Sequence, residues 1–354
     1  MSTSTRDGWA DTAKGLCIVL VVLWHVVAKH AANVDWGDSE GIAAWWALLS
    51  AQFLPLRMPL FFFISGLFAA RAVFAPDGSS AARRVGRLFG LYALWLTIQT
   101  FALAAAPDFE TARARDFAEF LAQLTFSPTN LWYFLALGVY LLIARATRKA
   151  PTAVVLAAAF AVSAVAAAGV LPDWGNFWQV VQNLFFFLAG LRLGDRAKRM
   201  AGAATLTATV SAAAAFGVGL VAVSVLGARQ WFGVWPLLCA VSVVFGLLGC
   251  AMLDRYLPRA TRPLRWIGQK TLPIYVLHMI PLALIDRALR SDGAAGALAN
   301  PVMAVSEPIL LTALVILVCL AVHGLMVRCG LKVLFDPLLV LPKAPAREPS
   351  RAGR

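Results

Sequence analysis

The sequence predicts an all-α, polytopic membrane protein with about ten transmembrane helices and both termini in the cytoplasm. Of its 354 residues 60% are hydrophobic and 14% are charged, and the mean hydropathy is +0.76. A soluble globular protein of this size needs far more charge on its surface. Apolar runs near the length of a bilayer span recur along the chain.

The expected spans are these apolar runs, separated by polar loops. They cover residues 13–31, 44–72, 85–106, 131–144, 153–171, 177–193, 204–226, 232–253, 272–289 and 309–327. We expect Pro55 and Pro59 to interrupt the second span, because proline removes a helix hydrogen bond. The fourth span is short.

The basic residues set the orientation. With the N-terminus in the cytoplasm, Lys and Arg in the inner segments outnumber those in the outer loops by about four to one, and the bias alternates along the chain. The net charge of +13 therefore follows membrane topology and forms no single patch, which argues against nucleic acid as a partner. We expect a transmembrane domain over residues 1–335 and a basic, disordered cytoplasmic tail over 336–354.

The first span combines a basic residue at its start with a histidine inside it. Lys14 and His25 are eleven residues apart, so they lie on nearly the same face of a helix, and Asp11 falls near that face. An ionisable side chain within a span is costly and marks a functional site by default. We interpret His25 as a general base; the alternative is a histidine that only makes a hydrogen bond between helices.

Arg57 lies within the second span, at a depth expected to match that of His25. A buried guanidinium needs an anionic or carbonyl partner. It is predicted to stabilise a developing oxyanion or to bind a phosphate. Alternatively, it binds backbone carbonyls that the flanking prolines release.

A second group of candidates would bind the donor and line the cavity. Arg71, Arg83 and Arg84 flank the first cytoplasmic loop and, with Lys14 and Asp11, form a predicted polyphosphate site, although such arginines usually only report topology. The cavity candidates are His278, Gln179, Asn183 and Trp132. A packed histidine, polar contacts between helices and an aromatic belt are the respective alternatives. No cysteine or histidine spacing indicates a metal site.

Three segments resemble the integral-membrane acyltransferase-3 family, and most closely its fucose 4-O-acetylase-like branch. They are RDGWADTAKGLCIVLVVLWH, RMPLFFFISGLFAAR and QKTLPIYVLH. The resemblance implies about ten membrane helices and O-acylation, often O-acetylation, of a carbohydrate by cytoplasmic acyl-CoA. It also implies that His25 is catalytic, within a basic-X10-His motif in which Lys14 replaces the usual arginine. Lysine cannot make the bidentate phosphate contact of arginine.

The sequence therefore predicts an O-acetyltransferase of the bacterial inner membrane. Its partners would be acyl-CoA, a carbohydrate or glycolipid acceptor and the bilayer, with acyl-CoA as a substrate and no permanently bound cofactor. The thioester would reach His25 along the first helix, and Arg57 would stabilise the oxyanion. The rival is a transporter or flippase of a lipid-linked saccharide. That rival is weakened because every acidic residue falls near a span end or in a loop.

Overall fold

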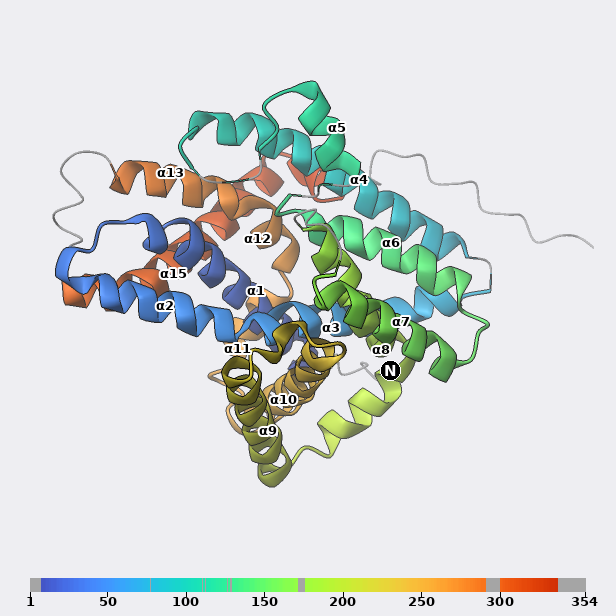
Figure 1. Cartoon of the computed structure of the whole chain (residues 1–354). Helices are drawn as coiled ribbons and strands as arrows, with labels where there is room; N and C mark the ends of the chain where they lie inside the picture. The colour runs from blue at the N-terminus through green and yellow to red at the C-terminus, as the bar shows by residue number, and fades with distance from the viewer. Residues whose placement is uncertain are drawn as a thin grey trace, which may run out of the picture.

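The structure is a computed structural model that describes residues 8–336, except 77, 110, 112, 126, 128, 171–175 and 291–299. Within these residues it contains helices and no strand, which confirms the all-α prediction. In Figure 1, α1 (Gly8–Lys29) and α3 (Leu54–Phe74) lie in the middle of the molecule. The predicted tail lies almost wholly outside the described residues.

Each expected span coincides with a helix or a pair of helices. The remaining ones are α2 (Glu40–Gln52), α4 (Ser79–Ala102), α6 (Trp132–Ala146), α7 (Thr152–Ala167), α8 (Phe177–Gly202), α9 (Leu206–Val225), α10 (Val234–Tyr256), α12 (Thr271–Leu277), α13 (Met279–Leu289) and α15 (Pro301–Arg328). Two short helices, α5 (Phe117–Thr125) and α11 (Arg262–Gly268), are additional.

Not every one of these helices is long and apolar enough to cross a bilayer alone. In the described part of the chain there are six candidate spans, one of which joins α2 and α3 (Gly37–Phe74), or seven if α12 and α13, bent by 45° at His278, count as one span. The helices α6 and α7 are apolar but shorter, with 15 and 16 residues. The protein is thus a multi-pass membrane protein, and the number of ten spans stays a prediction.

The second expected span is interrupted next to Pro55, as predicted, but not at Pro59. The helix stops at Phe53, and Pro55 sits in the first turn of α3, where its missing N–H costs nothing. Pro59 lies inside α3 without ending it. The carbonyl that Pro59 releases is that of Pro55, and Ser242 Oγ on α10 lies 2.6 Å from this oxygen and donates to it.

Glycines let two helix pairs approach to backbone contact. A Cβ on Gly66 of α3 would lie 2.0 Å from Phe187 O, and one on Gly190 of α8 would lie 1.8 Å from Phe63 O. The contact between α1 and α11 is built in the same way, by Gly15 and Gly268. Small residues allow this close packing in membranes, and here they fix α1 and α3, the two helices that carry His25 and Arg57.

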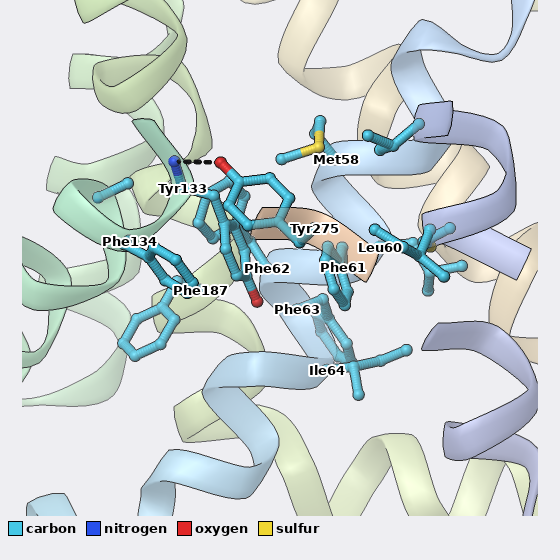
Figure 2. Packing of buried hydrophobic residues seen from close by; sticks show 14 of the residues in the cluster. Met58, Leu60, Phe61, Phe62, Phe63, Ile64, Tyr133, Phe134, Phe187 and Tyr275 are labelled. Atoms are coloured by element: carbon cyan, nitrogen blue, oxygen red, sulfur yellow. Dashed lines mark hydrogen bonds between the residues drawn. The ribbon is translucent and has the colours of Figure 1, made fainter. Parts of the chain in front are cut away.

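An aromatic cluster connects α3, α6 and α12 (Figure 2). Phe61 stacks on Tyr133 with ring centroids 4.8 Å apart, and Tyr275 meets Tyr133 edge-on at 5.5 Å. The Tyr133 backbone N–H donates to the Tyr275 hydroxyl at 3.1 Å, and that hydroxyl donates to Asn130 O at 2.6 Å. The buried hydroxyl is therefore satisfied, and α12 is anchored to the start of α6.

Candidate functional site

His25 and Arg57 line the same cavity, which we call the His25 cavity. Its volume is about 760 Å³, and its wall includes residues of α1, α2, α3, α6, α8, α9, α10, α12 and α13. Of the cavity candidates, Trp132 and Gln179 also line it. The predicted meeting of the imidazole and the guanidinium is therefore present, although His25 lies one turn before the end of α1 and not in its middle.

The hydrogen bonds of two histidines define the tautomer of His25. His278 sits at the break between α12 and α13, fully buried, with Nδ1 2.8 Å from Tyr275 O and 3.2 Å from Ile274 O. A carbonyl can only accept, so this Nδ1 carries the hydrogen and His278 Nε2 presents a lone pair. His25 Nδ1 lies 3.3 Å from that Nε2 and 2.8 Å from Val21 O, so it must donate as well.

The consequence concerns the other nitrogen of His25. With the hydrogen on Nδ1, a neutral imidazole carries its free lone pair on Nε2. His25 is partly exposed and lines the cavity, whereas His278 is buried behind it and is absent from the cavity wall. His278 thus acts on His25, with ring centroids 4.9 Å apart, and does not line the cavity as we predicted.

Arg57 is buried and has no counter-ion among the described residues. The residue is only 4% exposed, and its Nη1 has no hydrogen-bond partner in the described structure. Its guanidinium lies 4.3 Å from the centre of the Trp24 ring. The carbonyl released by Pro59 is bound by Ser242, so the prolines do not provide the expected backbone partner. A buried cationic donor without a partner is suited to bind negative charge within the cavity.

Gln179 and Asn183, the two polar candidates on α8, differ in the cavities that they line. Gln179 lines the His25 cavity and a neighbouring cavity of about 240 Å³, and Trp132 also lines both. Asn183 reaches only the smaller cavity, where its Nδ2 donates to Gln179 O at 2.8 Å. The prediction for Gln179 therefore holds in position, whereas Asn183 is one helical turn too far along α8.

At the other end of α1, Lys14 is paired and does not reach the His25 cavity. Its Nζ lies 2.7 Å from Asp11 Oδ1, and Gln269 Nε2 donates to Asp11 Oδ2 at 3.1 Å. Lys14 also lies over the Phe68 ring of α3 at 5.1 Å. Asp11 is only 2% exposed and orients Lys14, and it also lines a separate cavity of about 360 Å³ together with Arg262 and Arg265.

Phe68 connects this pair to the predicted donor arginines. Arg84 donates to Phe68 O at 3.3 Å, while Arg71, Arg83 and Arg84 are all exposed. Arg84 and Lys14 thus share a contact with Phe68, and none of the three arginines lines the His25 cavity.

The expected path along α1 from Lys14 to His25 is filled by side chains. Cys17, Ile18 and Val22, which lie between the two residues, are fully buried. On the face of α1 that these three side chains cover, the described structure leaves no space for an acyl chain.

A buried ionic cluster escaped the sequence analysis. His30, fully buried, lies 2.7 Å from Asp286 Oδ1 and 3.1 Å from Glu307 Oε1, and Arg290 Nε lies 2.9 Å from the same Asp286 oxygen. The sequence gives no sign of this cluster, because no local pattern links His30 to partners so distant along the chain. The cluster fixes the end of α1 to α13 and α15. In the described chain no group of His, Cys, Asp and Glu side chains can hold a metal ion.

Comparisons with known proteins agree with this architecture. The model of the acyltransferase domain family matches residues 7–324. The chain is similar to the inner membrane protein YcfT of Escherichia coli strain K12, with 30% identity over 303 residues that cover 80% of this chain and 82% of that protein. No solved structure matches. Because the family model covers nine-tenths of a chain that is built of membrane helices, the chain belongs to the acyltransferase-3 family and is a membrane acyltransferase.

Proposed function

We propose that the protein transfers an acyl group, an acetyl group in particular, from cytoplasmic acyl-CoA to a hydroxyl of a carbohydrate or glycolipid, with His25 as general base. The observation that supports it is the shared cavity: His25, whose Nδ1 is bound to Val21 O, and Arg57, whose Nη1 has no hydrogen-bond partner in the described structure, both line it. The relative in Escherichia coli is named an inner membrane protein, and we propose the same bacterial location here.

The proposed reaction uses both groups. His25 Nε2 takes the proton of the acceptor hydroxyl as its oxygen forms a bond to the thioester carbonyl carbon. The Arg57 guanidinium stabilises the oxyanion of the tetrahedral intermediate. The carbon–sulfur bond then breaks, and the proton on His25 passes to the leaving thiolate. While His25 is protonated, Val21 O and the lone pair of His278 accept from its Nδ1.

An acyl-histidine intermediate would use the same nitrogen. In that case Nε2 attacks the thioester first, and the acceptor hydroxyl attacks the acyl-imidazole afterwards. Release of CoA in a single turnover without acceptor distinguishes this route from direct transfer.

The donor phosphates would bind at the Lys14 end of α1. Lys14 and the exposed Arg71, Arg83 and Arg84 provide the positive charge, and Asp11 holds Lys14 in place. Because the helix between Lys14 and His25 is packed, the thioester reaches the cavity only if α1 and α3 or α4 separate. We propose that donor binding drives this opening.

The buried carboxylates do not favour the transport alternative. Every acidic residue is predicted near a span end or in a loop, and Asp286 and Glu307, although buried, lie close to the ends of their helices: Asp286 three residues before the end of α13 and Glu307 six residues after the start of α15. Both carboxylates already bind His30, so they form a closed cluster with no described cavity beside them. Family membership is what favours acyl transfer.

The test is acyl transfer by the purified protein with labelled acetyl-CoA and a panel of sugars. We expect His25→Ala to lower the rate by about a thousandfold, the range of general-base catalysis. His323→Ala is the matched control, because His323 lies on α15, outside the His25 cavity, and contacts Phe335. Equal rates for His25→Ala and His323→Ala, both monodisperse in detergent, would contradict the proposal.

A further inference from the structure

All the charged side chains on the described wall of the His25 cavity are basic. Lys29, Arg57 and Arg229 line it, and no aspartate or glutamate belongs to the described part of its wall. The other polar side chains on its described wall are neutral, among them Gln52, Asn176 and Gln179. A cavity lined by charge of one sign concentrates the field and attracts ligands of the opposite charge.

Two of the three cations are arginines held over tryptophan rings. The guanidinium of Arg57 lies 4.3 Å from the Trp24 ring centre, and that of Arg229 lies 4.5 Å from the Trp235 ring centre. Stacking leaves the edge of a guanidinium, with its N–H groups, free to bind a planar anion. Arg57 Nη1 is buried and unpartnered in the described structure, so an anion nearby would offset a real electrostatic cost.

Arg229 occupies the junction of three spaces. Together with Trp235 it lines the His25 cavity, the neighbouring cavity of about 240 Å³ and a third of about 360 Å³ beside α7 and α8. It is exposed and makes no ion pair with any described residue. It lies on the predicted outer side, in the connection between α9 and α10. A ligand that enters the His25 cavity from this junction must pass its guanidinium.

We propose that the acceptor is a hydroxyl-rich compound that carries an anionic group, a phosphate or a carboxylate, and that Arg229 is the residue that selects for this group. The hydroxyl to be acylated would lie at His25 while the anion binds at Arg229. Arg57 stays available for the oxyanion. The role of this compound as acyl acceptor rests on the proposed function, whereas its binding to the cavity does not.

Binding can therefore be measured without catalysis. We would use isothermal titration calorimetry on the protein in a detergent without a sugar headgroup, with two pairs of probes: glucose 1-phosphate against glucose, and galacturonate against galactose. We expect at least one anionic sugar to bind about tenfold more tightly than its neutral partner at low salt. This ratio should fall as sodium chloride screens the charge.

The variant Arg229→Gln should lower the ratio of anionic to neutral affinity about fivefold, the scale of an exposed charge pair. Arg115→Gln is the matched control, since it removes a charge from an exposed arginine of another predicted outer loop that lines none of the three cavities. Equal affinity for both members of each pair, or a ratio unchanged by Arg229→Gln, would overturn the inference.

The two proposals fail differently. If no sugar is acylated but the charge-dependent binding and its loss in Arg229→Gln are seen, the anion site stands and the proposed transfer fails. If a neutral sugar is acylated as well as its anionic partner, and the affinity ratio is one, the transfer stands and the selection for an anion is wrong.

Discussion

The two ends of α1 differ in whether the positive charge beside them is compensated by an anionic side chain. At the Lys14 end the ammonium is compensated by Asp11 at 2.7 Å, and that carboxylate is in turn held by Gln269. At the His25 end, Arg57 has no anionic partner in the described chain, and the hydrogen bonds of His25 there go to a carbonyl and a neutral imidazole. A charge that is already compensated gains little from a ligand, whereas an uncompensated one gains much.

This difference suggests separate roles for the two ends, the reaction at the His25 end and donor binding at the Lys14 end. The His25 end is prepared for charge that develops only during the reaction, so changes there should lower turnover. The Lys14 end is largely satisfied before any ligand binds, so changes there should alter donor affinity modestly. Three predictions test whether this division is correct.

Arg57→Met should have the largest effect of the three. We expect turnover at saturating substrate to fall by about a hundredfold or more, as when one oxyanion donor is removed. The melting temperature should stay the same or rise, because the variant removes an unpartnered buried cation. A protein that no longer inserts or that melts well below the wild type would instead show that Arg57 is structural.

His278→Phe should have an intermediate effect. The substitution removes the lone pair that accepts from His25 Nδ1 and leaves Val21 O as the sole acceptor. We expect turnover to fall about tenfold with little change in KM, because His278 positions the base and does not touch substrate. His278→Gln, whose carbonyl can accept the same hydrogen, should restore part of the rate; a loss equal in both variants would contradict a positioning role.

Much of the fold was predictable because helices in a bilayer follow from local composition. The apolar runs from residue 13 to 327 each became helix, since an unpaired backbone is too costly in lipid. The interruption predicted at Pro55 is present, whereas the one predicted at Pro59 was wrong for a physical reason. Pro59 is tolerated inside α3 because Ser242, far away in sequence, satisfies the carbonyl it releases.

The site was only partly predictable, because spacing within one helix says nothing about its neighbours. Counting residues brought His25 and Arg57 to one region correctly, and the pairing of Lys14 with Asp11 followed from their spacing. The contact of His278 with His25 depends on the bend between α12 and α13, and the His30 cluster joins three helices. Such contacts arise from tertiary packing and leave no periodic signal.

The smallest effects should come from the Lys14 end, and their signs test the comparison most sharply. Lys14→Met removes the ammonium and should raise KM for acetyl-CoA about threefold, with turnover unchanged. Asp11→Asn leaves Lys14 uncompensated and should lower that KM, because the free ammonium then attracts the donor phosphates more strongly. Initial rates at low and high salt would measure both effects, which should shrink together as salt rises. If both variants instead change turnover and leave KM unaltered, charge at this end serves the reaction itself, and the proposed division of α1 into a donor-binding end and a reacting end is wrong.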